Sequence, residues 1–534
     1  MMSDLPRQAD VVFVGAGHNA LVAAAYLLEA GRSVVLLEQM AQPGGWVRTT
    51  ELGTPGFHHD LWSAAHPAFV GGPVWAELGA DLTRHGLEYV TPPLAVGSSL
   101  PGGRTAVMPV DPRQLEAELD RLGETAGWGG LFAAAGPQLP MLMELLAAGL
   151  DSPRSQATLA RLLADSRDSA LPFGQLLSGS AIDLVRRHFK TEELRYLAAP
   201  WTLHFGVGPQ DPAGALWTLI ALAALGSGVP MPVGGSGRLA DALIGLVAER
   251  GGDVRCGVDV DEIFLADGRA AGVRTAGGAT VAARQAVIAS VTPDQLYGRL
   301  LRNAVEVPEG VRAQAAGYAF RRGCFQLNLA LSAPPRFADR RLNACGGVNL
   351  GRGLDELVTS VRQAEAGLLP QYPSISWHEP TAMDASRAPE GKAIVRLQIL
   401  DAPLAPNGDA AGVLPDIDGW SASTAEAFAD RVLAEAEQHL PGLGGLVLER
   451  HITSPADLAK ASPNAGPGDH AAGDNSLRQG LTQRPIPAHG GGYRTAVPGV
   501  WLIGAASWPS AAVSGASGRA VARTLTGQDL GRPG

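Results

Sequence analysis

Residues 9–20 read ADVVFVGAGHNA, and residues 34–38 read VVLLE. The first run predicts a buried β-strand that ends in a glycine turn and continues into a helix, and the second predicts another buried strand. Gly15 permits the tight turn, Gly17 lets the backbone approach a pyrophosphate, and the small side chain of Ala20 lets the helix pack against the sheet. The pattern therefore predicts the strand-turn-helix cradle of a dinucleotide site.

The ends of these two segments supply polar groups for the same ligand. The helix that follows Gly17 begins with His18 and Asn19, and its N-terminus presents free N–H groups and a positive dipole end to phosphate oxygens. The second strand ends on Glu38, whose carboxylate can accept hydrogen bonds from ribose hydroxyls. Strand, turn, helix, strand and acid fall in register, which a chance match among the 68 glycines of the chain would not give.

The stretch after Glu38 indicates which dinucleotide binds. It contains a second glycine pair, Gly44 and Gly45, and then the basic residue Arg48, where a nicotinamide enzyme would normally continue with further strand and helix units. The paired glycines let the backbone approach an extended cofactor a second time, and the guanidinium can offset phosphate charge. This arrangement favours FAD as the cofactor.

These motifs resemble the phytoene desaturase-like FAD-dependent oxidoreductases, a family within the amine-oxidase and GDI-like superfamily. The resemblance is strongest to the branch of pyridine nucleotide-disulfide oxidoreductase domain-containing protein 2, although the chain has no Cys-x-x-Cys pair. It recurs in three later stretches: PVGGSGRL at 232–239, YRTAVPGVWLIGA at 493–505 and AVSG at 512–515. The motifs thus span nearly the whole chain, which makes the resemblance more specific than the glycine turn alone.

The resemblance also implies positions around the cofactor. In the family, the valine that matches Val260 lies beside the adenine, and the glycine that matches Gly504 lies near the ribityl and pyrophosphate groups. The segment that begins with Ala512 and Val513 matches one that opens a helix aimed at the flavin ring. A helix N-terminus there would stabilise negative charge on the reduced flavin.

The spacing of the motifs predicts the architecture. Because the cofactor motifs are far apart in the sequence, we expect an α/β fold in which a Rossmann-like, GR2-type FAD-binding domain is assembled from three segments, with an α+β substrate domain that carries a helical insert. The expected FAD-binding domain comprises residues 1–70, 231–295 and 490–534, and the expected substrate-binding domain comprises residues 71–230 and 296–489.

Periodicity predicts elements of the second domain. Residues 112–122 and 139–146 have apolar residues at helical spacing, which predicts helices of a lid. Residues 324–331 and 393–400 alternate apolar and polar residues, which predicts half-buried strands of a sheet beneath the flavin. An apolar lid would favour a long hydrophobic ligand through burial of its surface, although core packing explains the same helical pattern.

Composition excludes several classes of function. A net charge of −10 argues against nucleic acid as a partner, because phosphates require a broad basic face. Three widely spaced cysteines give neither a disulfide framework nor a zinc motif, which favours the reducing cytoplasm. No apolar run is long enough to span a bilayer, which leaves room for peripheral contact with a membrane. His58, His59 and His66 are too loosely spaced to predict a metal site, so we expect none.

The sequence leaves several activities open. The favoured one is an FAD-dependent desaturation or dehydrogenation of a hydrophobic, carotenoid-precursor-like substrate, with hydride transfer to flavin N5, and no catalytic residue is assigned to it. A carotenoid ketolase or isomerase is a close variant. A flavin amine oxidase shares the architecture, and many of these enzymes use a lysine near N5, for which Lys392 is the residue to test. A GDI-like binding protein without chemistry is the third alternative, and the electron acceptor is not indicated.

Overall fold

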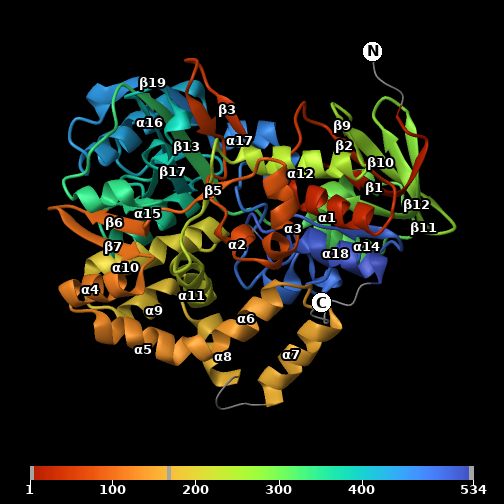
Figure 1. Cartoon of the computed structure of the whole chain (residues 1–534), viewed down its shortest axis with the longest axis horizontal. Helices are drawn as coiled ribbons and strands as arrows, with labels where there is room; N and C mark the ends of the chain where they lie inside the picture. Colours follow the sequence, from red (N-terminus) through yellow and green to blue (C-terminus); the bar gives the residue numbers. More distant parts are fainter. Residues whose placement is uncertain (1–4, 165–169, 511, 528–534) are drawn as a thin grey trace.

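The computed structural model describes residues 5–164, 170–510 and 512–527. The ends of the predicted FAD-binding domain, 1–4 and 528–534, lie outside this part of the chain. The described residues form two seven-stranded sheets and three two-stranded ones. Figure 1 shows the two large sheets side by side, with several helices of the insert along the lower edge of the molecule. The limits of the two predicted domains stay a prediction.

The first large sheet has the strand order β10-β11-β12-β1-β2-β9, with β20 paired to the last part of β12. Five strands, β20, β12, β1, β2 and β9, pair in parallel, and β10 and β11 form an antiparallel hairpin at the start of β12. Three distant parts of the sequence thus build one sheet, which confirms the predicted Rossmann-like fold. The strands are β1 (Gln8–Val14), β2 (Val34–Glu38), β9 (Asp253–Cys256), β10 (Val260–Ala266), β11 (Arg269–Thr275), β12 (Thr280–Ala289) and β20 (Val500–Leu502).

Helices cover both faces of this sheet, so its central strands are apolar and buried on both sides. α1 (His18–Glu29) connects β1 to β2 and is buried along most of its length, as its alanine-rich sequence predicts. It packs against α18 (Ala516–Thr526), where a Cβ atom on Gly518 would lie 2.0 Å from the carbonyl oxygen of Asn19. Glycine at this position therefore sets the distance between the first and last helices of the fold.

The second large sheet has the order β19-β13-β17-β16-β14-β6-β7 and is antiparallel except between β14 and β6. It draws strands from both parts of the predicted substrate domain, because the hairpin of β6 and β7 comes from the otherwise mostly helical first part. The strands are β6 (Leu94–Leu100), β7 (Arg104–Pro109), β13 (Gly323–Leu331), β14 (Val348–Leu350), β16 (Ile375–His378), β17 (Ala393–Ala402) and β19 (Val447–Thr453).

β13 and β17 are strands where alternation predicts them, but the expectation that they are half-buried is wrong. Every residue of both strands is buried. The apolar face packs against α16 (Ala422–Glu437). The polar face is covered by the backbone of residues 60–62: Gln326 donates to the carbonyl oxygen of Leu61 at 2.7 Å, Asn328 to that of Asp60 at 3.2 Å and Arg396 to that of Trp62.

The helical insert follows β7 in the sequence. The two predicted helices have the predicted bounds: α4, where Asp111 caps the N-terminus and Gly123 ends the helix at φ 70°, and α6. Among the described residues no helix has both the length and the apolar character required to cross a bilayer. The helices are α4 (Pro112–Leu122), α5 (Thr125–Ala135), α6 (Leu139–Leu146), α7 (Pro153–Ala164), α8 (Leu171–Ser178), α9 (Ala181–His188), α10 (Glu192–Ala198) and α11 (Gly214–Leu225).

Shorter strands and the remaining α-helices connect these parts. The strands are β3 (Thr49–Glu51), β4 (His58–Asp60), β5 (Tyr89–Val90), β8 (Met231–Pro232), β15 (Leu368–Leu369) and β18 (Gly408–Asp409). The helices are α2 (Pro67–Val70), α3 (Pro73–Arg84), α12 (Gly237–Glu249), α13 (Pro293–Gln295), α14 (Glu309–Ala316), α15 (Leu354–Glu365) and α17 (Pro455–Ala461).

Candidate functional site

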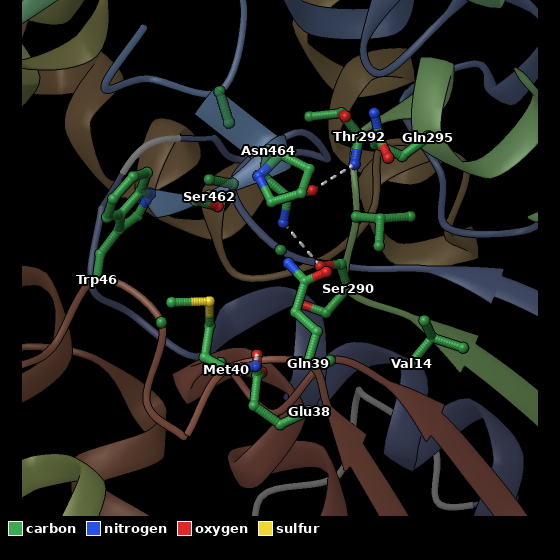
Figure 2. A pocket seen from close by; sticks show the side chains of 18 of the residues that line it. Val14, Glu38, Gln39, Met40, Trp46, Ser290, Thr292, Gln295, Ser462 and Asn464 are labelled. Atoms are coloured by element: carbon green, nitrogen blue, oxygen red, sulfur yellow. Dashed lines mark hydrogen bonds between the residues drawn. The ribbon is translucent and has the colours of Figure 1, made fainter. Parts of the chain in front are cut away.

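A cleft with about 1100 Å³ of space, partly open to solvent, lies at the carboxyl ends of the parallel strands of the first sheet. Val14 at the end of β1, Glu38 at the end of β2, Ser290 after β12 and Ile503 after β20 all line it (Figure 2). This edge is where open α/β sheets bind their ligands. Nine of the residues predicted to bind the cofactor line the cleft: Gly15, Gly17, His18, Asn19, Glu38, Gly45, Arg48, Val260 and Gly504.

The glycine turn shapes the floor of the cleft. Gly15 has φ 90° and its N–H donates to the carbonyl oxygen of Leu37 at 2.8 Å, which ties the turn to β2. Gly17 is the N-cap of α1 and has no side chain to occupy the free N–H groups of the first helical turn. These N–H groups and the helix dipole therefore form a site for an anion such as a pyrophosphate.

Glu38 is held by the backbone of the glycine turn and by that of the residues that follow β2. Its two carboxylate oxygens accept hydrogen bonds from the N–H of Ala16 at 2.8 Å and from the N–H of Met40 at 2.9 Å. A carboxylate oxygen can accept a further hydrogen bond, so both remain able to bind a diol. Val260, from the start of β10, lines the cleft together with Glu38, which agrees with an adenosine group at this end.

The two glycines of the second pair have different roles. Gly45 lines the cleft, and a Cβ atom there would lie 3.3 Å from the Cα of Gly17. Gly44 is not among the lining residues: its N–H donates to the carbonyl oxygen of Ala16 at 2.8 Å, and a Cβ atom there would lie 2.8 Å from the Cβ of Ala240 on α12. Gly44 thus positions the loop, and Gly45 opens it to the ligand.

The C-terminal segment joins the cleft through a buried chain of hydrogen bonds. The N–H of Gly504 donates to the hydroxyl of Ser517 at 3.1 Å, and that hydroxyl donates to Asn19 at 3.0 Å. Burial lowers the pKa of His18 to about 4, although a hydrogen bond with the backbone of Ala512 acts in the opposite direction. The imidazole is therefore neutral near neutral pH. The hydrogen bonds of Ser517 thus connect the N-terminus of α1 with that of α18.

Three other predicted cofactor residues lie outside the lining of the cleft. Ala20 is in the first turn of α1 and is fully buried, as its predicted packing role requires. Ala512 and Val513 precede α18, and Ala512 contacts the site through its hydrogen bond with His18. Direct contact of Ala512 and Val513 with a cofactor stays a prediction.

Some lining residues have no local sequence signal. Asn464, in the loop after α17, donates to the carbonyl oxygen of Ser290 at 3.0 Å and accepts from the N–H of Thr292 at 3.2 Å (Figure 2). The sequence indicates only a loop at this position. Trp46 and Trp62 also line the cleft and pack edge to face, with ring centroids 4.7 Å apart. Trp46 directly follows the second glycine pair, which is the one signal that could have identified it.

A fully buried arginine holds two loops of the cleft together. Arg484 donates to the carbonyl oxygen of Ala505 at 2.7 Å and to that of Asp474 at 2.9 Å. Its second amino group also reaches the carbonyl oxygens of Ala471 and Ala472 at 3.3 and 3.4 Å. Because Ala472 and Ala505 line the cleft, this one side chain fixes the position of two parts of its wall.

Two buried hydrogen-bond donors of the cleft have no acceptor among the described residues. The Nε atom of Arg48 and the indole N–H of Trp62 are buried and have no hydrogen-bond partner among the described residues. The Arg48 guanidinium lies 5.6 Å from the centre of the Trp62 ring. FAD carries phosphate and ring carbonyl oxygens, which are acceptors. The donor set, together with the helix N-terminus and Glu38, therefore fits FAD.

His66 is buried and has structural partners, whereas His58 lies near the surface. His66 binds the hydroxyls of Tyr89 at 2.9 Å and Ser236 at 2.8 Å, and His58 lies 3.8 Å from Glu51 at the surface. Among the described residues no group of three or more potential ligands is placed to hold a metal ion.

We expect the folded protein to lose stability as the pH falls from 6.5 towards 4. Burial lowers the pKa of His18 and His59 from 6.5 to about 4 and that of His66 to about 3. In this window the unfolded chain binds protons that the folded chain does not, so each histidine lowers the free energy of unfolding by about 1.4 kcal/mol per pH unit. Urea unfolding followed by circular dichroism at several pH values measures the slope.

The variant His59→Gln isolates one of these groups. Its free energy of unfolding should fall less steeply with decreasing pH than that of the wild type, because one proton uptake by the unfolded chain is removed. His58→Gln, at a neighbouring side chain open to solvent, is the matched control and should fall more steeply than His59→Gln. Equal slopes for the two variants would contradict the assignment.

Comparison with known proteins identifies the class of site. A family model for flavin containing amine oxidoreductases matches residues 21–362, more than half of the chain. Pyridine nucleotide-disulfide oxidoreductase domain-containing protein 2 of Mus musculus is 26% identical over 98% of this chain and 94% of its own length. The lycopene-forming phytoene desaturase of Pseudescherichia vulneris is 26% identical over 96% of this chain and 98% of its own length.

A solved structure shares the fold. Cyclohexylamine oxidase from Brevibacterium oxydans superposes with a TM-score of 0.59 at 16% identity, covering 97% of this chain and 98% of that one. The architecture, the glycine turn with its acid, and the family match agree with one another. The chain belongs to the flavin containing amine oxidoreductase family and is an FAD-dependent oxidoreductase.

Proposed function

We propose that the protein desaturates a hydrophobic, carotenoid-precursor-like substrate: a hydride from one C–H bond would pass to N5 of the flavin, and a proton would leave the adjacent carbon to solvent as the C=C bond forms. The observation that carries this proposal is the apolar end of the cleft. Trp46 and Trp62, which line it, pack against the large apolar core of the helical insert together with Trp201 and Phe205. Such surroundings favour an apolar ligand through the surface that it buries.

The chain contributes binding and orientation to this reaction. When bound, FAD supplies the hydride acceptor. Glu38 would hold the ribose, the N-terminus of α1 would bind the pyrophosphate, and Arg48 would offset its charge. Arg396 donates to the backbone carbonyl oxygen of Trp62, which lines the cleft. The N-terminus of α18 stays the predicted partner of negative charge on the reduced ring.

The lining of the cleft favours this activity over a lysine-assisted amine oxidation. Among the described residues that line it none is a lysine, and Lys392, the residue to test, directly precedes β17 outside that lining. A ketolase or an isomerase would use the same apolar site, and analysis of the product separates these activities from desaturation. The electron acceptor stays open.

Anaerobic titration of the FAD-loaded protein tests the proposal. We expect apolar isoprenoid compounds, among them phytoene and isoprenoid alcohols and acids, to bleach the flavin absorbance, and putrescine and cyclohexylamine to leave it unchanged. Bleaching by an amine together with none by any isoprenoid would overturn the proposal in favour of amine oxidation. Product analysis by mass spectrometry should show the loss of two hydrogen atoms.

The surroundings of the protein in the cell stay a prediction as well. The cytoplasm is the expected compartment, and contact with a membrane surface would give access to an apolar substrate. Leu163 on α7, Leu171 on α8 and Met143 on α6 are 72%, 64% and 51% exposed, on the helices along the lower edge of Figure 1. Sedimentation with lipid vesicles tests whether this edge binds them.

A further inference from the structure

Arg396, on β17, is a buried cation without a counter-ion. Its side chain is 5% exposed, and it donates to the carbonyl oxygen of Trp62. Its Nε atom has no hydrogen-bond partner, and no carboxylate of the described residues forms an ion pair with it. Burial lowers the pKa of Arg396, which reflects the cost of removing an unpaired charge from water.

The charges around Arg396 do not neutralise it. The nearest acid, Asp60, is already paired with Arg387 at 2.9 Å, and both side chains are buried. Asp60 also accepts hydrogen bonds from the hydroxyl of Thr49 at 2.7 Å and from the N–H of Ser236 at 2.8 Å. One carboxylate thus faces two guanidinium groups, and the cluster has one excess positive charge.

The neighbouring histidines add no negative charge and little positive charge. Burial lowers the pKa of His378 to about 3, with the charge of Arg396 as the next cause, and that of His59 to about 4. Burial also lowers the pKa of His204, and the electrostatic effects of His378, His470 and Arg396 lower it further. These imidazoles are neutral near neutral pH, so the excess charge of the cluster is that of the arginine.

Arg396 lies directly behind the apolar end of the cleft. The carbonyl that it binds belongs to Trp62, whose ring lines the cleft. A second, small cavity of about 10 Å³ is lined by Arg396 together with His59, Asp60 and Asn328. Nearby, the ring of Trp201 stacks on His204 with centroids 4.6 Å apart, and its buried indole N–H also has no acceptor.

We propose that the substrate has an apolar body with a carboxylate at one end, and that Arg396 binds this carboxylate. The inference rests on the proposed oxidation of an apolar substrate and names its chemical class more closely. A planar guanidinium matches a carboxylate in geometry and charge, and the site offers donors that the protein itself leaves without acceptors. A pure hydrocarbon would leave the buried charge unpaired, which is costly.

Calorimetric titration of the FAD-loaded protein with two ligands of one carbon skeleton tests the proposal. Geranylgeranoic acid should bind about 10- to 100-fold more tightly than geranylgeraniol, because the acid adds charge-assisted hydrogen bonds. In Arg396→Gln the affinity for the acid should fall by the same factor, while the affinity for the alcohol should stay within about twofold of the wild type. Equal binding of acid and alcohol to the wild type would overturn the proposal.

Further variants separate recognition from folding. Arg396→Lys keeps the charge and should keep a preference for the acid, reduced because an ammonium group does not bind a carboxylate in a bidentate manner. Arg340→Gln, at an exposed arginine, is the matched control and should bind both ligands as the wild type does. If Arg396→Gln does not fold, as judged by its circular dichroism and flavin content, the wild type and Arg396→Lys decide. Loss of the preference in Arg396→Lys would then count against the proposal.

The same measurements distinguish failure of this inference from failure of the proposed function. A preference for the acid without any bleaching of the flavin would support the carboxylate site at Arg396 and contradict the proposed oxidation. Bleaching by isoprenoid alcohols and acids alike, with equal affinities, would support the proposed oxidation and contradict the role of Arg396 as the carboxylate site.

Discussion

Replacement of Gly17 by valine is expected to abolish useful binding of FAD while the protein stays folded. Gly17 has φ −68° and ψ 166°, which any residue adopts, and the nearest atom to a Cβ at this position is the hydroxyl oxygen of Ser290 at 3.8 Å. The fold itself therefore has room for a Cβ atom at this position. The valine would instead fill the space through which the N-terminus of α1 binds the pyrophosphate.

The expected loss is large because several charge-assisted hydrogen bonds depend on this approach. At about 1.5–3 kcal/mol each, the loss of two of them lowers the affinity for FAD by a factor on the order of 100 to 1000 or more. Titration of the apoprotein with FAD measures this change, and urea unfolding measures stability. Gly310→Val, at an exposed glycine of α14 with no atom within 4 Å of its Cβ position, is the control. Tight FAD binding by Gly17→Val would place the pyrophosphate elsewhere.

Replacement of Arg484 by methionine is expected to destabilise the fold and the cleft together. The substitution keeps a long apolar side chain but leaves four carbonyl oxygens without the guanidinium that binds them. Tyr318 and Gln479 still donate to the carbonyl oxygens of Ala472 and Asp474. The buried carbonyl oxygens of Ala471 and Ala505 lose their donor, so the free energy of unfolding should fall by about 3–5 kcal/mol. Because Ala472 and Ala505 then lose their common anchor, the affinity for FAD should fall about tenfold as well.

Arg478→Met is the matched control for this second variant. It makes the same substitution six positions earlier, at an exposed side chain, and should change the free energy of unfolding by no more than about 0.5 kcal/mol. Urea midpoints and FAD titrations of the two variants give the comparison. If Arg484→Met unfolds at the wild-type midpoint, the loops at Ala472 and Ala505 do not depend on the buried guanidinium.

The parts of the fold that follow from local sequence could be predicted. The strand, turn and acid around Gly15 and Glu38 are contiguous patterns, and α4 has the predicted bounds because Asp111 and Gly123 cap it. The burial of β13 could not be predicted in the same way. Its polar face is covered by residues 60–62, more than 260 positions earlier in the sequence, and alternation alone is also typical of a strand that faces solvent.

The candidate site shows the same limit. Residues at the ends of predicted strands, such as Glu38 and Gly504, line the cleft because the topology of a parallel sheet brings strand ends together. Asn464 and Arg484 lie in loops without periodicity, and their importance comes from hydrogen bonds to distant carbonyl groups. Arg396 occupies a polar position of an alternating strand, and only the tertiary structure distinguishes it from a solvated arginine.

The assembly of the first sheet from distant parts of the chain has a consequence for biosynthesis. β2 ends at Glu38, whereas β20 begins at Val500, so the ribosome must translate most of the chain between the two. At about 5–20 residues per second this takes roughly 20–90 seconds. During this time β1 and β2 can pair with each other and with β12 and β9, whereas β12 still lacks its partner β20. The segment that adds Ile503 and Gly504 to the cleft is translated last, so the cleft is complete only when translation is almost finished.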